Sequence, residues 1–84
     1  MDTPQDTIRN ARSTARVHFD DGHYTTGAIW EGIADAIGLM CDVGMPEAAL
    51  RLDDEETKEA SAHRWLNADV AKAGAEFLRK HYTT

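Results

Sequence analysis

The alternation of apolar and polar residues between positions 14 and 26 predicts a β-hairpin. Asp21 and Gly22 are a strong turn signal, because a type I′ turn needs positive φ at both central positions and this pair tolerates it. Side chains alternate between the faces of a strand, so this turn sorts the flanking residues into two sets. The apolar face carries Ala15, Val17, Phe19, Tyr24 and Thr26, and the polar face carries Arg16, His18, Asp20, His23 and Thr25.

The segment that follows, residues 28–42, has the apolar spacing of an amphipathic helix. Its apolar stripe consists of Ile29, Trp30, Ile33, Ala34, Ile37, Met40 and Cys41. An isolated hairpin is marginally stable in water, so its apolar face needs a cover. We therefore expect Val17, Phe19 and Tyr24 to pack under this helix, which begins after a Thr25 or Thr26 cap and ends at Gly44, just before Pro46.

Two further helices are predicted in the second half of the chain, over residues 54–66 and 68–82. Asp53 and Glu56 have the spacing of a capping box for the first, and Asn67 is the expected N-cap of the second. Residues 46–52 fit either a short helix or a third strand, and a proline at the first helical position favours the helix.

The first 13 residues are a short helix over 4–12 or a flexible terminus. Thr3 suits an N-cap, Pro4 suits the first helical position, and Asp6 sits where a capping acid helps. The predicted fold class is therefore α+β, with one hairpin packed by three or four helices in a single domain over residues 14–84.

The length and composition of the chain indicate the size of its core and the compartment in which it is expected. A chain of 84 residues is expected to form one domain with a modest core. It has no apolar run long enough to span a bilayer and no start that resembles a signal peptide. A lone cysteine, Cys41, forms no internal disulfide and fits a reducing compartment, so the expected location is cytoplasmic.

The net charge of −6 is concentrated in the middle of the chain. Residues 1–19 carry +1 and residues 60–84 carry +2, whereas residues 20–59 hold eleven acids against two bases, a charge of −9. Such an acidic region disfavours nucleic acid or an anionic membrane as a direct ligand and favours a basic protein surface. Acidity that serves only solubility is the simpler interpretation.

Three side chains near the predicted turn could bind a metal. His18, Asp20 and His23 share the polar face of the hairpin, and two imidazoles with a carboxylate are a candidate zinc or copper set. Outward polar residues on any amphipathic hairpin explain the same pattern.

No motif in the chain identifies a reaction or a cofactor. Cys41 lies on the apolar stripe of its helix, which predicts a buried, inert thiol rather than a nucleophile. Trp30 and Trp65 are expected in or beside the core, and an exposed tryptophan would be the best candidate for a binding hot spot. We expect a protein that is not an enzyme.

The leading hypothesis is a small protein-binding module that docks an acidic surface onto a basic partner. A narrower form is an inhibitor that covers a nucleic-acid-binding site by charge mimicry. Anti-CRISPR proteins and other small phage-encoded inhibitors have this general size and charge, which is an analogy of class and not a sequence match. The expected partner-binding residues are Asp53, Asp54, Glu55, Glu56 and Glu59, helped by Asp20, Asp21, Glu31 and Asp35.

Two alternatives stay open. The chain could be an accessory subunit that forms a homodimer or joins a larger assembly through the hairpin edge. It could also be a small metal-binding domain built on His18, Asp20 and His23.

Overall fold

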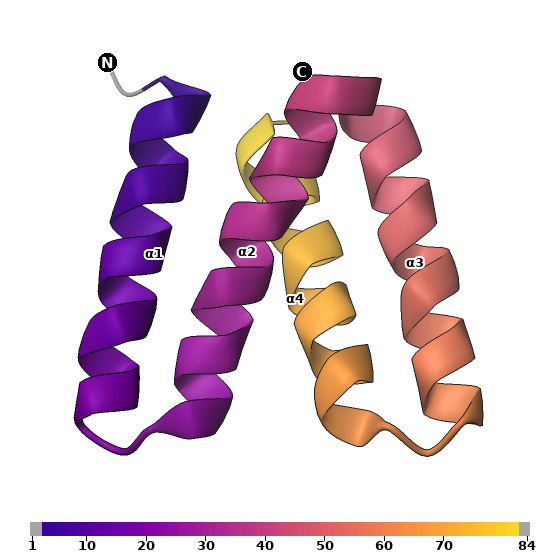
Figure 1. The fold of residues 1–84 in the computed structure, drawn as a ribbon. Helices are drawn as coiled ribbons and strands as arrows, with labels where there is room; N and C mark the ends of the chain where they lie inside the picture. Colours follow the sequence, from indigo (N-terminus) through magenta and orange to yellow (C-terminus); the bar gives the residue numbers. More distant parts are fainter. Residues whose placement is uncertain (1–2, 83–84) are drawn as a thin grey trace.

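The computed structural model describes residues 3–82, and over that range the chain folds into helices only. The elements in chain order are α1 (Pro4–Asp20), α2 (Tyr24–Val43), α3 (Met45–Ser61) and α4 (Trp65–Tyr82). They run alternately down and up, so that both the α1–α2 turn and the α3–α4 turn lie at one end (Figure 1). The predicted α+β class is wrong, because residues 3–82 contain no strand.

The predicted hairpin over 14–26 is a junction between two helices. Gly22 has a φ of +80°, as the turn chemistry required, but it follows the last turn of α1. The His23 N–H donates to the His18 carbonyl at 2.7 Å, and the Gly22 N–H donates to the Phe19 carbonyl at 3.0 Å. This pair of bonds is a Schellman motif, which ends a helix with glycine in the left-handed region. The turn predicted at Asp21 and Gly22 is present, but it ends a helix and does not connect two strands.

The two predicted faces of the hairpin do not exist. Ala15 is buried and Phe19 half-buried, but Val17 is 58% exposed and Tyr24 is 68% exposed. Ala15 and Phe19 are four residues apart, which satisfies the period of a strand and of a helix equally. Ile8 and Ala11 extend the helical spacing toward the N-terminus.

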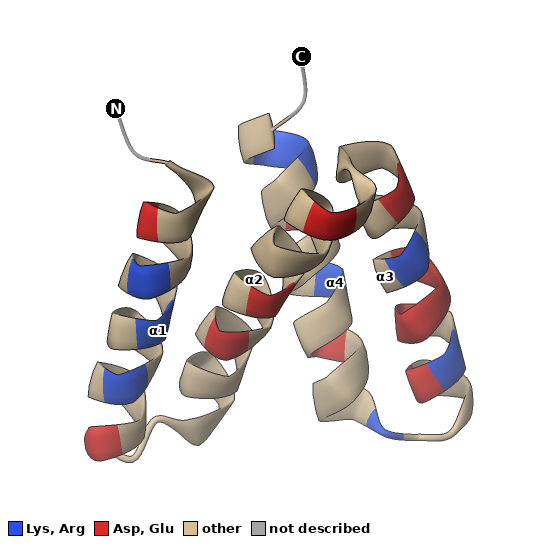
Figure 2. Ribbon diagram, turned by 45° about the horizontal axis from the view of Figure 1, so that its top comes forward, with Lys and Arg blue, Asp and Glu red and all other residues tan. Residues whose placement is uncertain are grey.

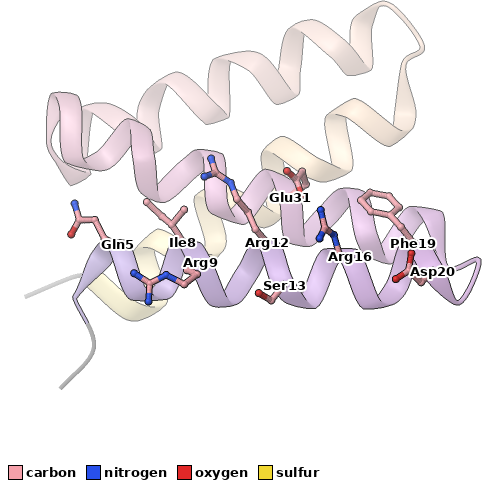
Figure 3. Close-up of a pocket in the computed structure, with 9 residues that line it drawn as sticks. All are labelled: Gln5, Ile8, Arg9, Arg12, Ser13, Arg16, Phe19, Asp20 and Glu31. Carbon is pink, nitrogen blue, oxygen red and sulfur yellow. The ribbon is translucent and has the colours of Figure 1, made fainter.

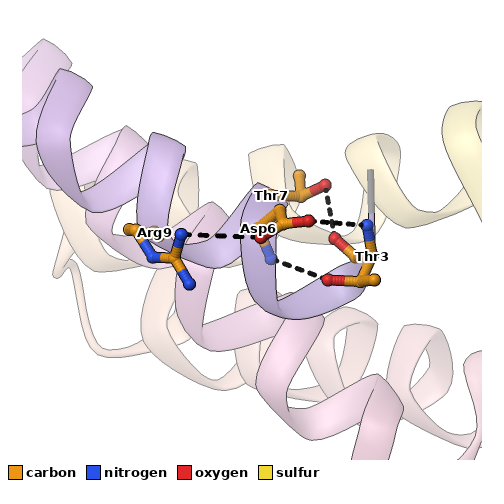
Figure 4. A network of polar contacts seen from close by, with 4 residues as sticks. All are labelled: Thr3, Asp6, Thr7 and Arg9. Atoms are coloured by element: carbon orange, nitrogen blue, oxygen red, sulfur yellow. Dashed lines mark hydrogen bonds and ion pairs between the residues drawn. The ribbon is translucent and has the colours of Figure 1, made fainter. Parts of the chain in front are cut away.

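The start of α1 confirms the capping prediction (Figure 4). The Asp6 N–H donates to the Thr3 hydroxyl at 3.1 Å, and the Thr3 N–H donates to the Asp6 carboxylate at 3.2 Å. The predicted helix over 4–12 is correct in its start but continues to Asp20. The predicted boundary between residues 13 and 14 therefore falls inside a helix.

The helix predicted over 28–42 is confirmed but begins earlier. α2 starts at Tyr24, so Thr25 and Thr26 lie inside the helix, and His23 is its N-cap without a side-chain capping bond. Its C-terminal end is as expected, because Gly44, with φ of +89°, follows Val43 and donates its N–H to the Met40 carbonyl at 2.8 Å.

α3 joins two segments that the sequence separated. Residues 46–52 are helical, which confirms the favoured alternative, and the same helix continues through the acidic run to Ser61. Asp53 is therefore in the middle of a helix and not an N-cap, so the predicted bounds 54–66 are wrong. α4 begins at Trp65, which places Asn67 inside that helix too.

The helices are arranged in the spatial order α1, α2, α4, α3, with α1 and α3 at the outer edges (Figure 1). α2 contacts all three other helices, whereas the backbone of α1 approaches only α2. Ile37 of α2 and Leu78 of α4 are the largest fully buried side chains at the centre. The result is flat, with extents of 32 × 30 × 18 Å.

α2 and α4 cross closely because glycine occupies the contact. A Cβ at Gly32 would collide with the Val70 side chain, and a Cβ at Gly74 would lie 3.0 Å from that of Ala36. Glycine lets two helix backbones approach where a larger residue would hold them apart. Gly38, in the same helix as Gly32, meets nothing within 4 Å.

Candidate functional site

The nine acids predicted to bind a partner lie at three places in the fold. Asp20 and Asp21 end α1, and Glu31 and Asp35 lie one turn apart on α2. The remaining five, Asp53, Asp54, Glu55, Glu56 and Glu59, all lie on α3. Figure 2 shows acids spread over α2 and α3, with a row of basic residues along α1. The structure therefore divides the predicted surface, and consecutive acids of α3 point in different directions around the helix.

Ion pairs engage two of the five acids on α3. Arg79 of α4 donates from Nη1 to Asp53 Oδ1 at 3.1 Å and from Nη2 to the second carboxylate oxygen. This hydrogen bonding lowers the pKa of the Asp53 carboxyl. Arg64 donates to Glu59 across the α3–α4 turn. Asp53 and Glu59 are therefore already paired within the chain and are less available to a partner.

Asp54 and Glu55 remain as the acids of α3 most available to a partner, because Glu56, which also makes no ion pair among the described residues, is half-buried. Both are exposed, and neither takes part in an ion pair among the described residues. They line a shallow depression of about 370 Å³ together with Glu59 and three basic residues, Arg51, Lys58 and Arg64. The acidic surface is thus mixed in charge, with basic side chains between the carboxylates.

The tryptophan next to this depression is exposed. Trp65 is 60% exposed and its neighbour Leu66 is 44% exposed, at the start of α4. The Trp65 ring meets the ring of His63 edge-on, with centroids 5.6 Å apart. The expectation of a core position is wrong for Trp65, whereas Trp30 is half-buried against the core as predicted.

The α3–α4 turn that carries these rings has an unusual backbone. The His63 N–H donates to the Ala60 carbonyl at 3.0 Å, and the Arg64 N–H donates to the Glu59 carbonyl at 2.9 Å. This is a second Schellman motif, and His63 occupies its left-handed position with φ of +60°. Trp65 therefore projects from a turn whose geometry is fixed by backbone hydrogen bonds.

The candidate metal ligands are not brought together as a set. His18 lies in the last turn of α1 and His23 caps α2, with ring centroids 5.9 Å apart. Among residues 3–82, no group of three or more His, Cys, Asp or Glu side chains is placed to hold a metal ion. Cys41, predicted to be buried, is exposed near the end of α2.

The sequence reasoning missed a groove along α1 (Figure 3). Its volume is about 890 Å³, and one side of α1 lines it through residues spaced four, three, four and four apart. These residues are Gln5, Arg9, Arg12, Arg16 and Asp20, with Ile8, Ser13 and Phe19 beside them and Glu31 contributed by α2. The spacing was visible in the sequence, but assigning residues 14–20 to a strand concealed it.

Comparison with known proteins gives no family for this chain, since no family model, curated protein or solved structure matches it. Within residues 3–82, no helix has both the length and the apolar content needed to cross a bilayer.

Proposed function

We propose that this chain is a non-enzymatic protein-binding module. Its contact surface is the side of α3 that carries Asp54 and Glu55, the acidic side of α3, together with Trp65. The observation that carries the proposal is the exposed Trp65, which directly follows Arg64, a residue that lines the depression on α3. Tryptophan is the side chain most enriched among binding hot spots. Asp54 and Glu55, which make no ion pair among the described residues, supply charge that a basic partner can meet.

The charge of this surface supports a role in partner selection and association rate more than in affinity. Exposed charges at the edge of an interface steer the approach of a partner and are screened by salt. A large aromatic side chain that becomes desolvated supplies most of the binding energy. Trp65 is therefore the proposed anchor, and Asp54 and Glu55 are the proposed steering residues.

Inhibition by nucleic-acid mimicry is a narrower form of the same proposal. A mimic of the phosphate backbone needs carboxylates in series, because each phosphate carries one negative charge. Here Arg51, Lys58 and Arg64 lie between the acids. The geometry therefore supports binding to a basic protein surface in general better than it supports mimicry.

The test is a partner captured from the cells of origin and then measured in purified form. Trp65→Ala is expected to weaken binding by roughly 30-fold or more, which corresponds to a hot-spot loss of about 2 kcal/mol. Asp54→Asn with Glu55→Gln is expected to slow association and to reduce its dependence on salt.

The matched control changes two exposed acids elsewhere by the same charge. Asp42→Asn with Glu76→Gln lies outside the depression and outside the α1 groove. This control is expected to leave both rate constants unchanged. Binding that is insensitive to Trp65→Ala and to the Asp54 and Glu55 changes would refute the proposal.

A further inference from the structure

We propose that the α1 groove receives the acidic side of α3 from a second copy of this chain, so that copies associate head to tail. The inference rests on the proposed function, because it supplies the acidic side of α3 with one partner of defined chemistry. It assigns a role to a row of arginines that the fold of a single copy uses only weakly.

The arginines of the groove are available to a ligand. Arg12 lies 3.9 Å from Asp35 and Arg9 lies 3.5 Å from Asp6, and both pairs are exposed. Such surface ion pairs contribute little to stability. Arg16 makes no ion pair among the described residues. Three guanidinium groups thus outnumber the two carboxylates, Asp20 and Glu31, that line the same groove.

The shape of the groove suits an elongated occupant. Ile8 and Phe19 line it near its two ends, and their separation of eleven positions along the helix corresponds to about 16 Å. Both side chains are half-buried, so they offer apolar contact without being part of the fully buried core. The groove is open and has arginines between an apolar side chain near each end. A second helix lying along it could contact both apolar side chains and the arginines.

The outer side of α3 offers this groove two carboxylates and an apolar side chain, and Arg51 and Lys58 lie on the same side. Leu50 is 58% exposed, and Asp54 follows it by one helical turn with Glu55 beside it. An exposed leucine near two acids matches a groove that combines apolar side chains with arginines. Leu50 is one of the large apolar side chains that a single copy leaves exposed, and burying it in the groove would be favourable.

The placement of the two surfaces favours a second copy as the occupant. α1 and α3 form opposite edges of the molecule, and their backbones do not approach each other (Figure 1). Each copy therefore presents a groove lined by three arginines at one edge and the carboxylates of Asp54 and Glu55 at the other. A contact between unlike surfaces is heterologous, and it produces a ring if the rotation closes or an open chain if it does not.

The experiment measures the oligomeric state by sedimentation equilibrium from micromolar to millimolar concentration. The wild-type chain is expected to associate reversibly. One variant reverses the groove with Arg9→Glu and Arg16→Glu, which leaves Arg12 and its contact with Asp35 intact. A second variant reverses the helix with Asp54→Arg and Glu55→Arg. Each variant is expected to remain monomeric when alone, and circular dichroism checks that each is folded.

An equimolar mixture of the two variants restores opposite charges across the contact and is expected to associate again. Leu50→Ser is exposed and is expected to weaken association without unfolding the chain. A wild-type monomer at every concentration overturns the proposal. So does association that survives both charge reversals, or a mixture that fails to associate.

The outcome can be separated from that of the proposed function. The groove variant keeps Asp54, Glu55 and Trp65 unchanged, so it is expected to bind a captured partner while remaining monomeric. A chain that never self-associates but binds its partner through Trp65 refutes only the self-association. A chain that self-associates but binds its partner independently of Trp65 and α3 refutes only the proposed function.

Discussion

At the residue scale, two turns of the same geometry contain different residues at their left-handed position. Gly22 ends α1 and His63 ends α3, each with the same two Schellman hydrogen bonds. A residue with a Cβ is disfavoured by about 1–2 kcal/mol in this region, whereas glycine is not. The molecule thus contains its own comparison between a relaxed helix end and a strained one.

This comparison predicts opposite effects of two substitutions on stability. His63→Gly is expected to raise the free energy of unfolding by about 0.5–1 kcal/mol, since relief of backbone strain exceeds the entropy that glycine adds to the unfolded chain. Gly22→Ala is expected to lower it by a similar amount. Urea denaturation measures both, with Ala62→Gly as a control at ordinary φ in the same turn. A loss of stability in His63→Gly would mean that the ring contact with Trp65 outweighs the strain.

The lowered pKa of the Asp53 carboxyl predicts that the protein is less stable in acid. Its hydrogen bond and charge interaction with Arg79 lower its pKa in the folded state. A group with a depressed pKa contributes stability above its unfolded value, and that contribution is lost as the pH falls through the folded value. The free energy of unfolding is therefore expected to decrease once the pH is lower than about 4, which is the ordinary pKa of an aspartate.

The variant Asp53→Asn tests this assignment. Its free energy of unfolding is expected to be lower than that of the wild type at neutral pH and to decline less between neutral pH and acid. Asp54→Asn on the same helix makes no comparable ion pair and is expected to follow the wild-type profile. Identical acid profiles for Asp53→Asn and the wild type would show that this pair does not contribute.

At the element scale, the crossing of α2 and α4 depends on Gly32 but not on Gly38, which lies in the same helix. Gly32→Ala forces its new methyl group into Val70, whose branched side chain has little freedom to move away. We expect a destabilisation of about 1–3 kcal/mol from this overpacking. Gly38→Ala meets nothing within 4 Å and is expected to stabilise α2 by about 1 kcal/mol through helix propensity.

A double substitution confirms the cause of the Gly32 effect. Val70→Ala combined with Gly32→Ala removes the colliding methyl groups and is expected to recover part of the loss. Thermal denaturation of the single and double variants gives the coupling energy. Additive losses in the double variant would place the strain elsewhere than at this contact.

The bounds of α1 were predictable from the sequence, but its continuity was not recognised. Thr3, Pro4 and Asp6 marked the start of α1, and Gly22 marked its end, so both boundaries were present in the sequence. The error came from Ala15 and Phe19, whose spacing of four fits either period, and from a turn dipeptide used by hairpins and helix ends alike. Nothing between residues 4 and 20 breaks a helix, and greater weight on that continuity would have favoured one element.

The candidate site was predictable in part. Of the five acids predicted on α3, two are exposed and three are half-buried. The expectation that an exposed tryptophan is the best hot-spot candidate leads to Trp65, which is 60% exposed. Asp53 and Arg79 are 26 positions apart and lie on different helices, so no local sequence pattern predicts that they pair. The α1 groove required knowledge that residues 4–20 form one helix.

At the scale of the whole molecule, the helices differ in how firmly they are held. α2 contributes Ile33 and Ile37 to the core, whereas the buried residues of α1 are two alanines, Ala11 and Ala15. The backbone of α1 also approaches only α2, and α1 has fewer buried residues than any other helix, so it has the least packing to lose on opening. We expect native-state hydrogen exchange to show lower protection for the amides of α1 than for those of α2 and α4. Equal protection throughout would show that the molecule opens only as a unit.

The pattern of neighbours also has a kinetic consequence. Three of the four helix contacts join consecutive helices, and among the described residues only the α2–α4 crossing brings together elements that are not adjacent in the chain. Two helical hairpins can therefore form locally before the crossing at Gly32 and Gly74 docks them. Topologies rich in such local contacts fold in microseconds to milliseconds. If docking is the late step, a substitution at Gly32 raises the unfolding rate and leaves the folding rate nearly unchanged.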